Sequence, residues 1–348
     1  MENPIKSSTK STLYVANDEC DNSIVTKPAI FEAYDIIKQS PDCVKTPLLR
    51  NVEQLGMIKC KDDVQVHLKL ENMQTTGSFK ARGVTCQMTK ASSDVKSCAK
   101  RLVTMSAGNY GKAFAYFCRQ MGLKGTVIMP NTAPRSREIL IKSEGCDVIR
   151  VPSPDLMAKV GELVKKEGMT FLHPFNDYDL IAGYGSLGLE IIEDVTPDVV
   201  VVCCGGGGLL SGISAAIKLS GFENTRIYGV EPETANSMQL SFREGKACQL
   251  PTSRSVAAGL APPFTGKRCY AHANAFVDGI VTVTDRELVI ATKALYGKGL
   301  VVEPSGAAAF AALLCGKLPE IRGNVVVVIT GGNSTPDELS DLFRTFDA

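Results

Sequence analysis

The sequence contains no tryptophan, only three histidines and no region of strong net charge. Its 38 Lys and Arg residues nearly balance its 37 Asp and Glu residues, so the formal net charge at pH 7 is +1. Without a basic tract, the chain offers no electrostatic site for nucleic acid or for an anionic membrane. No apolar run approaches the roughly 20 residues that cross a bilayer, and the N-terminal residues lack the apolar core of a signal peptide. We therefore expect a cytoplasmic protein without a nucleic-acid or membrane partner.

The twelve cysteines form no C-x-x-C pair, and three histidines supply few further metal ligands. A zinc site therefore finds no support in the sequence. Free cysteines are often buried, so we interpret all twelve as small hydrophobic residues in reduced form. Cys203 and Cys204, at the end of an apolar run, fit this interpretation.

Alternating strand-like and helix-like segments predict an α/β fold. The 348 residues, 44% of them hydrophobic, suffice for two domains or one large one. Short, nearly continuous apolar runs between helices indicate parallel strands that are covered on both faces. The predicted strands are 64–70, 102–105, 126–130, 147–150, 199–204, 227–230 and 325–329. The predicted helices are 28–40, 110–121, 134–144, 155–167, 210–219, 285–297 and 305–315.

The order of these elements predicts two doubly wound parallel-sheet domains. The regular strand–helix block at 99–179 forms the smaller, substrate-binding domain. It is inserted between 1–98 and 180–348, which together form the larger domain. The polar segment 1–26 is expected to be loose, and 245–275, with its prolines and glycines, is expected to be irregular.

One lysine, Lys80, follows a predicted strand and a Gly-containing polar turn and begins a helix. A lysine at such a turn projects into a cleft, where desolvation removes its proton easily and leaves a nucleophilic amine. Most lysines are solvated surface charges, so Lys80 alone does not define a site. Three other segments decide the matter.

Four consecutive glycines, Gly205 to Gly208, lie between a predicted strand and a predicted helix. Glycine lets the backbone approach a ligand, and the helix N-terminus adds positive potential, so this segment predicts a phosphate site. It is not a Walker loop, because no Gly-Lys-Ser/Thr follows, and it departs from G-x-G-x-x-G. A tight turn without a ligand is the alternative, but four glycines are costly to order.

Two polar turns complete the set. Ser106, Ala107, Gly108 and Asn109 stand where a strand meets a helix, and free amides there would hold a carboxylate. A simple N-cap explains this turn equally well. Thr330, in Thr-Gly-Gly-Asn, follows the last apolar strand, where open α/β sheets bind ligands, although Gly and Asn also favour plain turns.

These four segments, in this order, resemble the fold-type II pyridoxal-phosphate enzymes, specifically the serine/threonine dehydratase and serine racemase group. The resemblance covers roughly 28–345. It implies a tryptophan synthase β-like fold, a larger domain that binds pyridoxal 5'-phosphate, and a homodimer. By this resemblance, Lys80 forms the Schiff base and acts as the base at Cα, Phe79 packs beside the cofactor ring, Asn109 bonds to the cofactor 3-oxygen, and Thr330 faces the pyridine nitrogen. The phosphate is expected to bind to Gly205, Gly206, Gly207, Gly208 and Leu209. The substrate carboxylate is expected to bind to Ser106, Ala107, Gly108 and Asn109.

The resemblance and the hydroxyl of Thr330 together favour β-elimination. A hydroxyl, unlike a carboxylate, does not keep the pyridine ring protonated, so the cofactor is a weaker electron sink. A long-lived carbanion is then disfavoured, whereas loss of a β-hydroxyl is easy. We therefore predict a dehydratase that converts L-serine or L-threonine to a 2-oxo acid and ammonia.

Two alternatives stay open. A serine or aspartate racemase needs a second acid/base group, and similar serine racemases carry Ser at the position of Ala107. A water or Tyr110 could replace that group. The other alternative is a non-catalytic homologue that only binds the cofactor, although the retention of Lys80, Asn109 and the glycines argues against it.

Two departures from the family concern a metal and the substrate. Relatives often bind a divalent cation through carboxylates near Glu231, but the second acidic position is Ser237 here. A lone carboxylate is a poor site for Mg²⁺ or Ca²⁺, so we predict no metal, with Glu231 as the only weak candidate. Ala258 replaces the Asp that many relatives carry before Gly259, which leaves the preferred amino acid open among serine, threonine and hydroxyaspartate.

Overall fold

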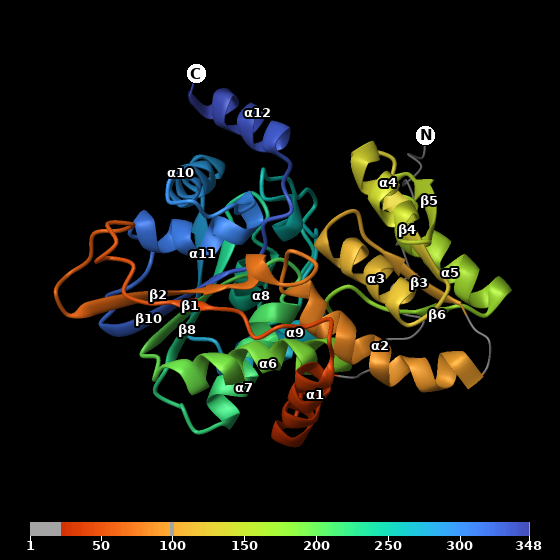
Figure 1. The fold of residues 1–348 in the computed structure, drawn as a ribbon, viewed down its shortest axis with the longest axis horizontal. Helices are drawn as coiled ribbons and strands as arrows, with labels where there is room; N and C mark the ends of the chain where they lie inside the picture. Colours follow the sequence, from red (N-terminus) through yellow and green to blue (C-terminus); the bar gives the residue numbers. More distant parts are fainter. Residues whose placement is uncertain (1–21, 98–100, 348) are drawn as a thin grey trace, which may run out of the picture.

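The computed structural model describes residues 22–97 and 101–347 (Figure 1). Most of the segment predicted to be loose, 1–26, therefore lies outside the described residues, as do Cys20 and Cys98. The remaining ten cysteines are free thiols, and Cys43, Cys60, Cys248 and Cys315 are only partly buried. The other six are buried.

A six-stranded sheet forms the centre of the larger part of the molecule, in the order β1-β2-β10-β7-β8-β9. The short first strand pairs antiparallel with the second, and the other pairs are parallel. The central strands consist mainly of buried valines, as expected where helices cover both faces. The strands are β1 (Leu48–Leu49), β2 (Val64–Leu70), β7 (Val199–Cys203), β8 (Arg226–Pro232), β9 (Gly279–Val283) and β10 (Gly323–Ile329).

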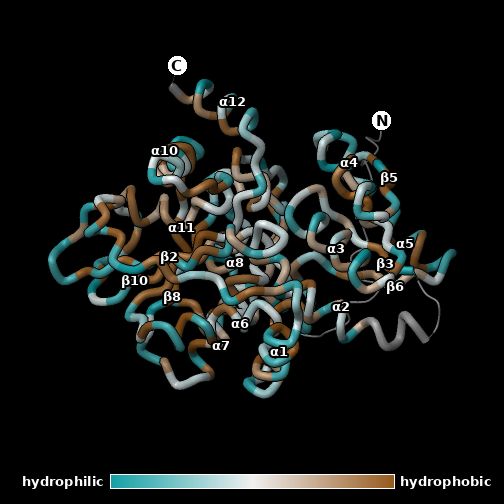
Figure 2. The backbone as a smooth tube through the Cα atoms, in the orientation of Figure 1, coloured by the Kyte–Doolittle hydropathy of each residue, from teal (hydrophilic) through white to brown (hydrophobic). Residues whose placement is uncertain are grey.

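Helices cover both faces of this sheet. Figure 1 shows α6 and α7 on one face and α10 and α11 on the other. In Figure 2, hydrophobic residues concentrate in the centre of the molecule and hydrophilic ones in the outer loops and helix faces. Of the helices described, none is long and apolar enough to span a membrane. The helices are α1 (Lys27–Gln39), α2 (Lys80–Ser97), α6 (Tyr178–Asp194), α7 (Gly208–Leu219), α8 (Ser237–Glu244), α9 (Lys267–Phe276), α10 (Asp285–Tyr296), α11 (Pro304–Leu314) and α12 (Pro336–Asp347), with short 3₁₀ turns η2 (Glu71–Met73) and η4 (Ala258–Leu260).

A four-stranded parallel sheet, in the order β5-β4-β3-β6, is built from chain that lies between β2 and β7. The fold is therefore α/β with two parallel sheets, one interrupting the other in sequence. The domain boundaries at 99 and 179 stay a prediction. The elements are β3 (Leu102–Met105), β4 (Gly125–Pro130), β5 (Asp147–Val151), β6 (Thr170–Phe171), α3 (Asn109–Gln120), α4 (Arg135–Ser143), the 3₁₀ turn η3 (Ser153–Asp155) and α5 (Leu156–Glu167).

Each predicted strand and helix is present, with ends within two residues of the prediction. The prediction of irregular structure for 245–275 is wrong at its end, because α9 begins at Lys267. This helix packs on α7, and its buried residues include Arg268 and His272, whose polar side chains hide the helical pattern. Sequence analysis also missed α6, whose long run of buried residues lacks a polar face.

Candidate active site

Lys80 is the first residue of α2, at the carboxyl end of β2. The turn before it is fixed to the loop after β10. The backbone N–H of Phe79 donates to the Thr330 carbonyl (3.0 Å), and Ser78 forms an isolated bridge with Gly331. Because β2 and β10 are parallel neighbours, their carboxyl ends meet at one edge of the sheet. The structure thus brings Lys80 and Thr330 together where α/β sheets bind ligands.

The amine of Lys80 lies in a largely apolar setting, although part of the side chain remains accessible. Its Nζ donates to the Pro174 carbonyl (3.1 Å) and lies 4.9 to 5.5 Å from the ring centroids of Phe79, Tyr184 and Tyr110. Burial lowers the pKa of Lys80 to about 8, against a smaller opposing effect of two neighbouring cysteines. A lysine with this pKa is partly neutral near pH 7 to 8 and can act as a nucleophile.

A buried ion cluster holds the first turn of α2, and sequence analysis missed it. Arg82 is fully buried, and its guanidinium forms hydrogen bonds of 2.7 to 2.9 Å with the carboxylates of Glu71 and Glu190. Lys69 on β2 pairs with the same Glu190 (2.8 Å). The cluster joins β2, α2 and α6, and so it fixes the backbone that carries Lys80.

The glycine loop packs against the segment that accepts the Lys80 hydrogen bond. A Cβ on Gly206 would lie 2.3 Å from the Phe175 ring, and one on Gly208 would lie 2.7 Å from the Phe175 carbonyl oxygen. Gly207 has φ +97°, in the left-handed region that favours glycine, and is the N-cap of α7. These positions therefore require glycine for packing as well as for ligand approach.

The same loop exposes unused hydrogen-bond donors. In the described part of the chain, the backbone N–H groups from Gly205 to Leu209 find no acceptor. Buried N–H groups without a partner are rare, and a row of them at a helix N-terminus is suited to a phosphate. The residues present thus form an anion cradle beside the Lys80 region.

Some of the backbone N–H groups in the turn before α3 form hydrogen bonds within the turn itself. The Ser106 hydroxyl accepts from the backbone N–H groups of Gly108 (3.2 Å) and Gly111 (3.0 Å), which is the capping alternative considered above. The N–H groups of Asn109 and Tyr110 have no acceptor among the described residues. The N–H of Ala107 also has no acceptor among these residues, so the turn keeps three free donors. A carboxylate at this turn stays a prediction, and Ser106 contributes as a cap.

The side-chain amide of Asn109 is held in one orientation. Its oxygen accepts from Asn333 Nδ2 (2.8 Å), and its nitrogen donates to Glu303 Oε1 (2.5 Å). The amide nitrogen has two hydrogens, so one N–H remains for a ligand. Asn333 also donates to the Thr76 carbonyl (2.9 Å) and accepts from Lys112 (2.6 Å). Sequence analysis placed Asn333 in a motif but did not predict these contacts.

Thr330 is buried, and its Oγ1 lies 3.3 Å from the Cys203 sulfur. Burial raises the pKa of Cys203 to about 11, so the thiol is neutral. Among the described residues, the side-chain contact of the Thr330 hydroxyl is therefore with a neutral group. The position of a pyridine nitrogen against Thr330 stays a prediction.

Glu231, the weak candidate for a metal ligand, binds the start of a helix in this structure. Its carboxylate accepts from the backbone N–H groups of Met238 and Gln239 (both 2.8 Å) at the start of α8, and burial raises its pKa to about 8. Ser237 is buried and accepts a hydrogen bond from Thr265 (3.0 Å). The described residues contain no group of three His, Cys, Asp or Glu side chains placed to hold a metal.

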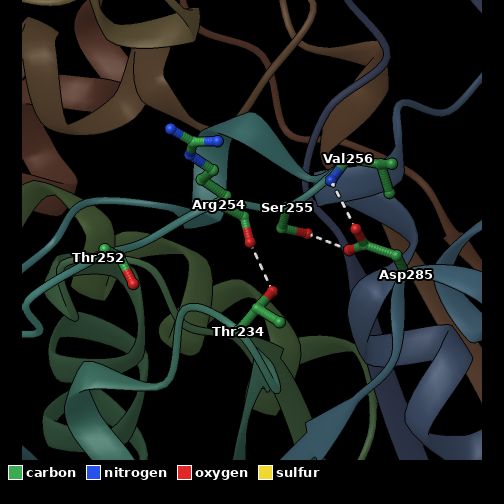
Figure 3. Close-up of a pocket in the computed structure, with 6 residues that line it drawn as sticks. All are labelled: Thr234, Thr252, Arg254, Ser255, Val256 and Asp285. Carbon is green, nitrogen blue, oxygen red and sulfur yellow. Dashed lines mark hydrogen bonds between the residues drawn. The ribbon is translucent and has the colours of Figure 1, made fainter.

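A cavity of about 580 Å³ lies away from these residues, between the β8–α8 connection and the start of α10 (Figure 3). Its polar groups are largely paired with one another. Asp285 accepts from the Ser255 hydroxyl (2.5 Å) and the Val256 N–H (3.3 Å), and Thr234 donates to the Arg254 carbonyl. The cavity contains none of the predicted site residues, so its size does not mark the active site.

Three features lie at the ends of the parallel strands: the Lys80 amine with its lowered pKa, the glycine loop with free N–H groups, and the fixed amide of Asn109. Together they fit an enzyme whose cofactor carries an aldehyde and a phosphate. The family model described as "Pyridoxal-phosphate dependent enzyme" matches residues 40–331, and the chain belongs to this family. Its cofactor is pyridoxal phosphate. The free N–H groups of the glycine loop and the amine of Lys80 fit the phosphate and the aldehyde of that cofactor.

Individual relatives agree with the family assignment. The chain is 37% identical over 296 residues to "L-threonine dehydratase catabolic TdcB" of Escherichia coli (strain K12), a match that spans 83% of this chain and 88% of that protein. Maize serine racemase superposes with a TM-score of 0.82 at 29% identity, covering 93% and 99% of the two chains. Threonine deaminase isoform 2 of Solanum lycopersicum gives a TM-score of 0.80 at 28% identity, covering 92% and 94%.

Proposed function

We propose that the protein is a pyridoxal-phosphate-dependent ammonia-lyase that removes the β-hydroxyl of L-serine or L-threonine and releases a 2-oxo acid and ammonia. The observation that carries this proposal is the amine of Lys80, whose pKa burial lowers to about 8 beside the glycine loop. The E. coli relative, named a threonine dehydratase, supports the reaction class.

Lys80 is proposed to hold the cofactor covalently and to move the proton at Cα of the substrate. Pyridoxal phosphate, when bound, withdraws electrons from the bonds at Cα of an amino acid. The lowered pKa lets the Lys80 amine accept a proton near neutral pH and return it. Phe79 packs beside the same amine, with its ring centroid 4.9 Å from Nζ.

The other residues are proposed to bind and orient. The N–H groups from Gly205 to Leu209 hold the phosphate. The remaining N–H of Asn109 meets the cofactor 3-oxygen, and Thr330 places a neutral hydroxyl at the pyridine nitrogen. The turn from Ser106 to Asn109 holds the substrate carboxylate through the free N–H groups of Asn109 and Tyr110.

Racemisation is the second candidate, and with Ala107 unable to move a proton it would depend on Tyr110 or on a water. The Tyr110 hydroxyl donates to Gln87 (2.6 Å), and burial raises its pKa well above the usual value. A tyrosine whose hydroxyl already donates a hydrogen bond, and whose pKa is raised, is a poor base at neutral pH. This supports elimination over racemisation. Cytosolic location and a homodimer stay predictions from the sequence.

One experiment tests the function directly. The purified protein, loaded with pyridoxal phosphate, is incubated with L-serine, L-threonine and their D-enantiomers, and 2-oxo acid, ammonia and enantiomer composition are measured together. We expect equal amounts of oxo acid and ammonia. Racemic product without ammonia would favour the racemase, and bound cofactor without any product would favour the non-catalytic homologue.

A further inference from the structure

Three aromatic rings lie around the amine of Lys80. Its Nζ atom lies over the rings of Phe79, Tyr184 and Tyr110, at 4.9, 5.4 and 5.5 Å from their centroids. Tyr110 belongs to α3 and Tyr184 to α6, so the rings come from separate elements. A ring face attracts a cation at distances up to about 6 Å, so each of the three can stabilise a charged lysine. We call these three rings the aromatic cage.

The amine of Lys80 has no carboxylate partner within residues 22–97 and 101–347. Its Nζ donates to the Pro174 carbonyl (3.1 Å) and forms no ion pair there. Its pKa is shifted by burial and by Cys203 and Cys269, whereas Asp177, which acts on both tyrosines of the cage, is not among these groups. A charged amine in such a pocket is costly unless another group stabilises it. Among the described residues, the ring faces and one carbonyl remain for this.

The titratable side chains that act on Lys80 or touch it are neutral at about pH 7. Burial raises the pKa of Cys203 to about 11 and that of Cys269 to about 12. Burial lowers the pKa of His173 to about 3, with a smaller effect of the Lys80 charge. It raises the pKa of both tyrosines of the cage well above the usual value. A change of charge at about pH 8 in this pocket therefore belongs to Lys80.

Tyr184 supplies its ring to the pocket, and no hydrogen bond within the described residues. Its side chain is fully buried, and its hydroxyl has no hydrogen-bond partner there. The ring contacts Phe79, with centroids 4.9 Å apart. It also lies against the first turns of α2, where a Cβ on Gly83 would be 2.4 Å from a ring carbon. Gly83 thus lets the ring lie close to the backbone that carries Lys80.

We propose that the aromatic cage is a binding site for the protonated amine of Lys80, which occupies it whenever the amine is not joined to the cofactor. This rests on the proposed function, in which Lys80 holds the cofactor and takes the proton from Cα. That proton converts the amine to an ammonium, and the ring faces stabilise the charge in the absence of a carboxylate. Return of the proton restores the neutral amine. Tyr184 and Tyr110 are thus positioning residues for the lysine.

The first test varies the charge on the face of ring 184 while its shape is nearly kept. Tyr184→Phe removes no hydrogen bond within the described residues and is the reference. Phenylalanines with one to five fluorines, introduced at position 184 by suppression of an amber codon, then weaken the negative ring face stepwise. The rate of cofactor uptake by the cofactor-free full-length protein is measured against pH.

The ring face stabilises the charged form of Lys80, so a weaker face lowers its pKa. The pH at which the rate of uptake levels off should therefore fall with each fluorine. With five fluorines the fall should reach about 0.4 to 1.5 pH units, the equivalent of one cation–π contact. A levelling pH that does not move along the series, or that rises, would overturn the proposal.

The second test uses the loaded protein and needs no turnover. Glycine displaces Lys80 from the cofactor and frees its amine, but it has no β-hydroxyl to lose. Its apparent Kd is measured from the change in the visible absorbance band. Because the cage stabilises the freed ammonium, the Kd should rise with fluorination, about 2- to 30-fold with five fluorines. An unchanged Kd along the series would contradict the proposal.

A matched control and the outcomes separate this proposal from the proposed function. The same fluorinated series at Phe117, a buried ring of α3 outside the cage, should change neither measurement. Equal effects at the two positions would overturn the cage, even with L-serine turnover and the proposed function intact. Absence of oxo acid and ammonia from every substrate would refute the proposed function, while both series would still decide the cage. A cofactor band that survives Lys80→Ala would refute both.

Discussion

Replacement of Gly207 by alanine tests whether the shape of the glycine loop determines cofactor binding. The residue has φ +97°, a conformation that costs an L-residue about 1–2 kcal/mol. A Cβ there would also lie 2.6 Å from Met238 Cε and 2.7 Å from Cys269 Cβ. Such overpacking costs a further ~1–3 kcal/mol. Gly207→Ala should therefore destabilise the protein by about 2–5 kcal/mol.

The chain offers a matched control for the backbone strain. Gly221 has φ +95°, nearly the same as Gly207, but a Cβ there would meet nothing within 4 Å. Gly221→Ala should then cost only the conformational part, about 1–2 kcal/mol. The difference between the two variants isolates the effect of the clash at the loop.

Urea denaturation of the loaded proteins, together with titration of the cofactor-free proteins with pyridoxal phosphate, measures both effects. The Gly207 variant must shift its loop, and with it the free N–H groups, so its affinity for the cofactor should fall at least about tenfold, or 1.4 kcal/mol. The Gly221 variant should bind the cofactor as the wild type does. Equal losses of stability and affinity in the two variants would refute the reasoning about the loop.

Three further predictions concern Lys80 and the residues that hold it. Lys80→Ala should abolish both the visible absorbance band of the bound cofactor and turnover; a retained band would contradict the assignment of the lysine. Burial lowers the pKa of Lys80 to about 8, so the rate at which the cofactor-free protein takes up the cofactor should rise with pH and level off above about pH 8. A rise that continues to about pH 10.4 would indicate an ordinary lysine. Arg82→Met leaves Glu71 buried without its cation and Glu190 paired with Lys69 alone, and should cost about 3–5 kcal/mol in urea denaturation. A loss below about 1 kcal/mol would show that the cluster relaxes readily.

Local features of the chain were predictable from the sequence because they depend on neighbouring residues. The strands are short buried runs; the glycine loop and Thr330 follow two of them closely, and Lys80 follows a third after the turn η2. Parallel strands bring their carboxyl ends to one edge, but the grouping of Lys80 with Thr330 in one site came from the family resemblance. The α/β class and the family resemblance were confirmed on this basis.

Contacts between distant residues could not be predicted in this way. Arg82 and Glu190 are 108 positions apart, and no local pattern marks either as a partner of the other. The hydroxyl of Ser106 is used within its own turn, which depends on loop geometry that spacing does not reveal. Residue type alone also does not fix burial, as the four partly exposed cysteines illustrate.

The side chain of Asn333 has a consequence for how the molecule can move. It stands at the end of the six-stranded sheet, yet it bonds to Asn109 and Lys112, which belong to the helix that follows the first strand of the other sheet. If the four-stranded unit swings away to admit a substrate, these bonds must break and the amide of Asn109 loses its fixed orientation. If Asn109 binds the cofactor as proposed, such a movement would weaken that contact at the same time.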